Sequence, residues 1–173
     1  MNSFDGLVAG FNKTMETWRF QLEKYRDEEL CAQPGAESWS IGQVVLHIIE
    51  ETTWYFDQIS TCLKSNENSE KGTSSEIQQW FAQNSFPNKQ FKGPPGLPTP
   101  PQPASKEALL DQFDDLAAKV RAVGKEIARR ESKGRAEHPG HGFLNAREWF
   151  QYAEIHMRHH ARQKDRIDDF LSS

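Results

Sequence analysis

Apolar residues recur at alternating intervals of four and three along several long stretches of this chain, which is typical of one buried face of an α-helix. In the first stretch the recurring residues are Phe4, Val8, Phe11, Met15, Trp18, Leu22 and Tyr25. A later series of the same kind consists of Leu109, Phe113, Leu116, Val120, Val123 and Ile127. No segment combines strict alternation with β-branched residues and turn signals, so a sheet has little support. The pattern predicts an all-α chain.

Capping residues mark the starts of the helices. In "SWSIGQ", Ser40 and Gln43 can satisfy each other's backbone amides as a capping box, and we expect this helix to end near Leu63. Ser105 is well placed to cap the helix that carries the later apolar series. Residues 145–148, "NARE", repeat the capping pattern. Four long helices can hide their apolar faces only against one another, so we predict a four-helix bundle.

The length of 173 residues and the hydrophobic content of 36% suit a single domain over residues 1–173. A long connection over residues 66–104 separates the second and third long helices, and it could cross the bundle and make these two helices parallel. Within it "SSEIQQWFAQ" is expected to form a short helix, whereas the prolines of "GPPGLPTPPQP" exclude one. The proline-rich stretch is read as a stiff linker, with folding over one end of the bundle as the alternative.

The net charge and the apolar content limit which binding partners and which cellular compartment can be expected. A net charge of −4 gives no general attraction to nucleic acid or to an anionic membrane, so we assign neither partner. No stretch approaches the roughly 20 apolar residues needed to cross a bilayer, and the first residues lack a secretion signal. We therefore expect a cytoplasmic protein, with Cys31 and Cys62 as buried, inert thiols.

The last long helix, expected to continue to Phe170 or Leu171, carries three histidines within five positions. Its inward stripe consists of Trp149, Ala153, His156, His160, Gln163, Ile167 and Phe170. His159 lies instead on a flanking face. Polar side chains at three successive inward positions are costly to desolvate unless each has a partner, and a metal ion is one such partner. Because residues four apart share a face, His156 and His160 can reach a single ion.

A third ligand is expected from the second long helix, where "QVVLHIIEE" surrounds His47 with aliphatic residues. Together, His47, His156 and His160 would hold a divalent ion through three neutral nitrogens and leave a position for water or substrate. An open position is typical of catalytic rather than structural zinc sites. A lone buried histidine is more often bonded to a backbone carbonyl, and an HxxxH pair is common by chance. Met157 follows His156 where a zincin has glutamate, which disfavours a standard metalloprotease.

Other polar residues are read as accessory or solvated. Glu50 and Glu51, one turn beyond His47, either orient the ligands from outside, supply an extra ligand, or are simply solvated, as acids on a long helix most often are. His138 and His141 lie in the turn "HPGHGF", where we expect surface exposure.

Two segments carry a resemblance to a known family: "ESWSIGQVVLHIIEE" and "GFLNAREWFQYAEIHMRHHARQ" resemble the DinB-like superfamily. The residues that match its pattern are Trp39, Ser40, His47, His156, His160 and Gln163. The resemblance implies a four-helix bundle, often a homodimer, whose three histidines bind zinc or nickel, with iron or manganese as further options. It implies no DNA binding, and the proline-rich stretch is not part of the common pattern.

Members of that superfamily include thiol S-transferases that use bacillithiol, mycothiol or glutathione, a mycothiol-dependent isomerase, and proteins labelled metal-dependent hydrolases. Our leading hypothesis is therefore a metal-dependent enzyme that activates a low-molecular-weight thiol, or water in a hydrolytic variant. The alternative is a non-catalytic metal-binding or stress-related bundle protein.

Overall fold

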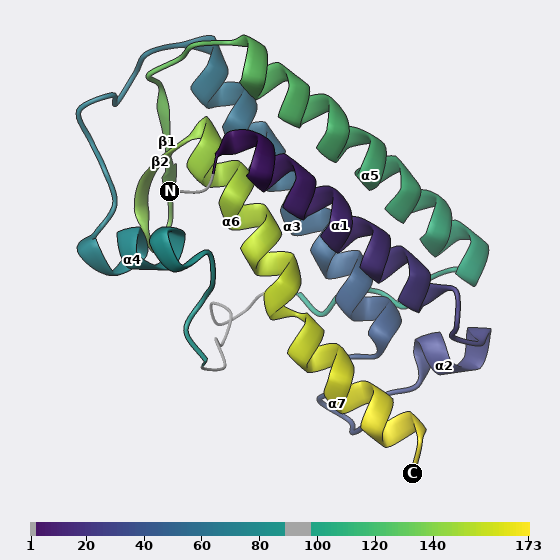
Figure 1. Ribbon diagram of the computed structural model, residues 1–173. Helices are drawn as coiled ribbons and strands as arrows, with labels where there is room; N and C mark the ends of the chain where they lie inside the picture. Colours follow the sequence, from purple (N-terminus) through teal and green to yellow (C-terminus); the bar gives the residue numbers. More distant parts are fainter. Residues whose placement is uncertain (1–2, 89–97) are drawn as a thin grey trace.

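Four long helices lie side by side with their apolar faces turned inward (Figure 1). The computed structural model describes residues 3–88 and 98–173. The long helices are α1 (Phe4–Leu22), α3 (Ile41–Lys64), α5 (Lys106–Arg129) and α6 (Ala146–His159), which α7 (Ala161–Leu171) continues. The short elements are α2 (Asp27–Cys31), α4 (Ser75–Gln83), β1 (Arg135–His138) and β2 (Gly142–Asn145). The predicted all-α bundle is confirmed, apart from this small two-stranded sheet.

The predicted capping residues define the helix starts. The hydroxyl oxygen of Ser40 accepts from the amide of Gln43 at 3.2 Å, and Oε1 of Gln43 accepts from the amide of Ser40 at 3.0 Å. Asn145 and Glu148 make the same reciprocal pair at the start of α6, at 3.0 and 2.8 Å. Ser105 caps α5 through the amide of Ala108. These bonds satisfy amides that have no partner inside the helix.

The long connection crosses the bundle, so α3 and α5 run parallel, as the length of residues 66–104 allowed (Figure 1). At one end, Nζ of Lys106 donates to the carbonyls of Glu23 and Tyr25, which places the start of α5 beside the end of α1. At the other end, Oγ of Ser132 donates to the carbonyl of Ser65, 3.0 Å away, which joins the ends of α5 and α3.

The core lies where α3 meets α1, α5 and α6. Phe11 and Phe150 pack edge to face with ring centroids 5.1 Å apart, and Phe56 stacks on Phe150 at 6.5 Å. Gly124 of α5 lets that helix approach closely, since a Cβ there would meet Val8 at 3.2 Å. Each fully buried large apolar side chain contributes about 1.5–3 kcal/mol. The packing of these buried side chains, such as Phe56 on Phe150, therefore holds α3 and α6 in fixed relative positions.

The last helix is interrupted at His160, which corrects the prediction of one continuous helix to the C-terminus. His160 has φ −69° and ψ −14°, and its carbonyl accepts from the amides of both Gln163 and Lys164 at 3.0 Å. This turn is tighter than regular α-helix and alters the phase of the residues beyond it. Beyond the turn Ile167 is buried, as predicted, whereas Phe170 near the end of α7, also predicted to face inward, is 41% exposed.

A short hairpin precedes α6, which the sequence patterns did not predict. Its strands are four residues each, with Arg135 opposite Asn145 and Ala136 opposite Leu144, too short for alternation to be recognised. His138 and His141 are partly buried here, so the expectation of surface exposure is wrong for both. Helix α2, with its buried Leu30, was also not predicted.

The connection between α3 and α5 contains the short helix α4, as predicted. Its end is held to α6 by Nε2 of Gln151, which donates to the carbonyl of Phe81 at 2.8 Å. Residues 93–97 of the proline-rich stretch lie outside the described part. The rest of that stretch covers the start of α3: Nε2 of Gln43 donates to the carbonyl of Pro100 at 2.6 Å, and Oγ of Ser40 donates to Oε1 of Gln102 at 2.8 Å.

The two cysteines differ in their surroundings. Cys62 is buried, and burial raises the pKa of its thiol to about 11, as expected of an inert group. Cys31 is exposed, contrary to prediction. None of the described helices is both long enough and apolar enough to span a bilayer.

Candidate metal centre

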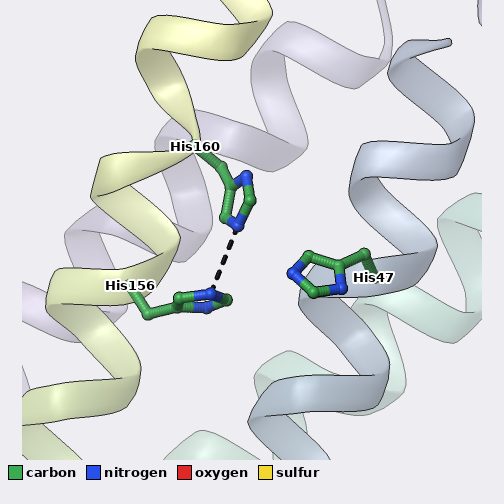
Figure 2. A group of neighbouring side chains, drawn as sticks. All are labelled: His47, His156 and His160. Atoms are coloured by element: carbon green, nitrogen blue, oxygen red, sulfur yellow. Dashed lines mark hydrogen bonds between the residues drawn. The ribbon is translucent and has the colours of Figure 1, made fainter. Parts of the chain in front are cut away.

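Three histidine side chains from two helices point toward one another (Figure 2). One nitrogen from each of His47, His156 and His160 lies within 4.8 Å of the corresponding nitrogens of the other two. Nε2 of His156 and Nε2 of His160 are 3.3 Å apart. The ring of His47 faces this pair, with centroids 5.4 and 4.9 Å from those of His156 and His160. The structure therefore brings together all three residues that the sequence singled out.

The orientation of His160 is fixed by Gln163, three residues further along the chain. Nδ1 of His160 and Oε1 of Gln163 are 3.0 Å apart. Because a carboxamide oxygen can only accept, this contact requires the proton on Nδ1 and leaves a lone pair on Nε2. That lone pair faces the interior of the cluster.

His156 lies deepest and is enclosed by aromatic rings. Tyr152 stacks on it at 9° and 6.5 Å between centroids, and Tyr55 meets it edge to face at 5.6 Å. Within the described residues its Nδ1 has no hydrogen-bond partner, and its Nε2 faces only His160. Two nitrogen lone pairs at this separation repel unless a proton or a cation lies between them. Among the described residues, the protein supplies neither a hydrogen-bond partner for Nδ1 of His156 nor a cation beside its Nε2.

His47 is held between a tryptophan and the helix-borne carboxylates. The ring of Trp39 packs against it with centroids 5.1 Å apart. Glu51 follows His47 by one turn, and its Oε2 accepts from the hydroxyl of Tyr55 at 2.9 Å. Neither Glu51 nor the exposed Glu50 belongs to the group of potential ligands. Solvation fits Glu50, whereas Glu51 is bonded to Tyr55 and is not simply solvated.

All three imidazoles are held in their neutral form. Burial lowers the pKa of His160 to about 4, with a further contribution from neighbouring His47. Burial, reinforced by the other histidines, lowers the pKa of His156 well below its ordinary value. Burial also lowers the pKa of His47, although Glu51 and Glu50 oppose this effect. At neutral pH each ring therefore has a lone pair available for a metal ion.

These residues fit a divalent metal ion. Three neutral nitrogens converge, Nε2 of His156 and Nε2 of His160 face each other at 3.3 Å, and the tautomer of His160 is fixed by a hydrogen bond outside the cluster. His159 is partly exposed on a flanking face, as predicted, and is not in the group. Within the described part of the chain, no other group of three or more His, Cys, Asp or Glu residues meets the same distance criterion.

The aromatic surroundings were not predicted as part of the site. Tyr152 precedes His156 by four residues, and Tyr55 follows His47 by eight, so both share a helix face with a ligand. That periodicity could have identified both tyrosines. It could not have shown that their rings lie against His156, because this depends on how α3 and α6 pack.

A histidine cluster between facing helices defines a class of protein, namely helical bundles with an interior site suited to a divalent metal. A family model described as the DinB superfamily matches residues 11–163, and the chain belongs to this superfamily. No curated protein matches the chain.

Proposed function

We propose that His47, His156 and His160 hold a divalent ion and that the protein is a metal-dependent enzyme acting on a low-molecular-weight thiol or on water. The observation that carries this proposal is the convergence of three neutral imidazoles in a group that contains no fourth protein ligand among the described residues. Structural zinc sites close all four positions with protein ligands, whereas catalytic ones leave a position for a reactant.

When bound, the ion supplies a Lewis acid that lowers the pKa of a coordinated thiol or water and so produces a nucleophile at neutral pH. The protein's own residues prepare the site. Gln163 fixes the tautomer of His160, and the rings of Tyr55 and Tyr152 exclude water from one side of His156. The Tyr55 hydroxyl holds Glu51, which provides a carboxylate one turn from His47 as a potential proton acceptor.

Zinc and nickel are our first candidates for the ion, since both suit imidazole ligands; iron, which also suits imidazole, and manganese, which prefers oxygen ligands, follow. Elemental analysis of protein purified without an affinity tag tests this step. We expect about one equivalent of metal per chain, and loss of that metal in His156→Ala. A metal-free wild-type protein that also fails to take up added zinc or nickel would overturn the proposal.

The reaction is tested with a panel of electrophiles, each offered with bacillithiol, mycothiol, glutathione or no thiol. Thiol-dependent turnover supports the transferase form, and turnover without thiol supports the hydrolase form. Activity should disappear in His156→Ala and persist in a matched variant, His141→Ala, which removes a histidine outside the cluster. Inactivity of the metal-loaded protein across the whole panel would count against an enzyme.

A second function is favoured by one observation: the ligands join α3 to the α6–α7 junction, so a bound ion would cross-link two helices of the bundle. The protein would then be a non-catalytic metal-binding or stress-related bundle. A large metal-dependent rise in melting temperature, with no exchangeable water or thiol ligand in the spectrum of cobalt-substituted protein, distinguishes this function from catalysis.

The proposal also includes a small-molecule substrate, a homodimer, a cytoplasmic location, and no nucleic-acid or membrane partner. The family resemblance supports the dimer and the small substrate, and the net charge of −4 argues against a polyanionic partner. Size-exclusion chromatography coupled to light scattering measures the oligomeric state of the purified protein directly.

A further inference from the structure

A second candidate site lies at the end of the bundle opposite to the histidine cluster. A cavity of about 310 Å³ is lined by residues from the ends of α3 and α5 and from the start of α6. The ends of α3 and α5 and the start of α6 can be located in Figure 1. Its lining residues are Leu63, Ser69, Ile127, Arg130, Ser132, Lys133, Arg135, Asn145, Ala146 and Arg147. At 1.5 Å per helical residue, Leu63 lies roughly 24 Å along α3 from His47. The cavity is therefore separate from the metal centre.

The lining is strongly basic. It includes Arg130, Lys133, Arg135 and Arg147 and no carboxylate. This local excess of positive charge contrasts with the net charge of −4 for the whole chain. A concave surface with charge of one sign concentrates ligands of the opposite sign.

Only part of this charge is neutralised by neighbouring acids. Arg135 pairs with Glu148 at 3.0 Å, and Arg130 lies 3.7 Å from Glu126. Lys133 and the exposed Arg147 have no carboxylate within ion-pair distance in the described part of the chain. Two cations of the lining therefore lack a carboxylate partner among the described residues, and the guanidinium of Arg147 lies over the ring of Phe4 at 5.1 Å, a contact that leaves its charge unneutralised.

The segment that carries Lys133 is held by contacts with backbone and side-chain atoms after the end of α3. Oγ of Ser132 donates to the carbonyls of Cys62 and Ser65, at 2.5 and 3.0 Å. Gly134 fits against the same carbonyls so closely that a Cβ would lie 2.3 Å from one and 2.4 Å from the other. The amide of Lys133 donates to Oδ1 of Asn66 at 2.9 Å. A site that is formed in advance loses little entropy on binding.

The cavity also offers neutral donors and an apolar floor. Ala146 and Arg147 are the first two residues of α6, and their amides have no protein acceptor within the described residues. Such amides, together with the positive end of the helix dipole, suit an anion. Leu63 and Ile127 are buried and provide apolar contact beside the charges. The volume is at the lower end of the range for small-molecule sites, roughly 300–1,000 Å³.

We propose that this cavity binds a small phosphate-bearing molecule through Lys133, Arg147 and the start of α6. A phosphate group matches the donors because it combines two negative charges with several acceptor oxygens. An apolar or neutral part of the same molecule rests on Leu63 and Ile127. This inference is independent of the metal centre and of the reaction proposed for it.

Isothermal titration of the full-length protein with inorganic phosphate, pyrophosphate and phenyl phosphate tests the inference. The test variant, Lys133→Gln/Arg147→Gln, removes the two cations that lack carboxylate partners. The control variant, Arg121→Gln/Lys125→Gln, removes two exposed cations of α5 that do not line the cavity. Both variants change the net charge equally, so a difference between them reports the cavity rather than general electrostatics.

We expect saturable binding by wild type and control, with affinity at least about tenfold weaker in the test variant, as loss of charge-assisted hydrogen bonds requires. Phenyl phosphate should bind more tightly than inorganic phosphate because of the apolar floor. The proposal is overturned if no phosphate compound binds saturably, or if the two double variants lose affinity equally. Preferential binding of a long oligonucleotide with no response to either phenyl phosphate or pyrophosphate would also overturn it.

Discussion

Nδ1 of His160 lies 3.0 Å from Oε1 of Gln163, and the same imidazole presents its Nε2 to Nε2 of His156 at 3.3 Å. Gln163 therefore controls the orientation of a candidate ligand without belonging to the histidine group. It holds the proton on the outer nitrogen of the ring, so that the inner nitrogen keeps its lone pair. The turn at His160 makes this contact available, because it brings residue 163 back toward residue 160.

Replacing Gln163 by alanine should weaken metal binding about 10- to 100-fold, because His160 would lose the partner that fixes its tautomer and ring orientation. Competition titration against a chromophoric chelator measures the affinity for zinc or nickel. Gln112→Ala is a suitable control, since Gln112 is exposed and bonds only within its own helix. Equal affinities for the two variants would show that Gln163 does not support the site.

The three candidate ligands could be predicted because helical periodicity determines which side chains share a face. His156 and His160 are one turn apart, and His47 lies in an aliphatic run, so the inward direction of each followed from the sequence. Their convergence depends on which two helices pack together. The aliphatic surroundings of His47 indicated the second long helix as the source of the third ligand, and the shared family pattern agreed with this.

The predictions that were wrong have a common cause: they depend on how elements pack together, which local sequence patterns do not predict. His138 was expected in an exposed turn because "HPG" is a turn signal, yet its ring stacks on Trp149 at 5.4 Å between centroids. The turn is real, but β1 and β2 fold it back onto α6. Similarly, Phe170 was assigned to the inward stripe on helical periodicity alone, yet near the end of α7 it is 41% exposed.

Acid should destabilise the protein partly through His138. Burial lowers the pKa of its imidazole to about 4, with a smaller contribution from His141, against 6.5 for the exposed group. The unfolded chain therefore binds the proton more readily. This contribution to stability is complete above pH 6.5, and it is lost progressively as the pH falls toward 4.

His138→Phe should keep an aromatic ring at this position while removing the titration. We expect the stability lost between pH 7.5 and pH 4.5 to be smaller in this variant than in wild type by about 1–2 kcal/mol, allowing for the partial exposure of the ring. Urea unfolding at the two pH values, with chelator present throughout, measures this difference. An identical loss of stability in both proteins would contradict the assignment.

Gly134 should not tolerate a side chain. A Cβ would lie 2.3 Å from the carbonyl oxygen of Ser65 and 2.4 Å from that of Cys62, and backbone atoms cannot move aside as a flexible side chain can. We expect Gly134→Ala to lower the free energy of unfolding by about 1–3 kcal/mol. Gly140→Ala, where a Cβ would meet nothing within 4 Å, should change it by less than about 0.5 kcal/mol. Thermal and urea unfolding of the two variants provide the comparison.

The ion pair between Glu154 and Arg158 is the clearest case in which the effects of two substitutions should not be additive. Glu154 is 6% exposed, and its carboxylate accepts two hydrogen bonds from Arg158, at 2.5 and 2.8 Å, and one from Thr14 at 2.8 Å. Arg158 also donates to the carbonyl of Asn84 at 2.6 Å. The pair thus joins α6 to α1 and to the segment after α4, and its two members flank the candidate ligand His156 in the sequence.

Arg158→Leu leaves the Glu154 carboxylate buried with only a neutral partner, so we expect a loss of about 2–4 kcal/mol in the free energy of unfolding. Glu154→Leu leaves the guanidinium, which can reach solvent because its side chain is 39% exposed, and should cost less. The double variant should lose less than the sum of the two single losses, because it removes both charges and so leaves no unpaired charge behind. Urea unfolding of all four proteins completes the cycle, and additive losses would mean that the two side chains contribute independently.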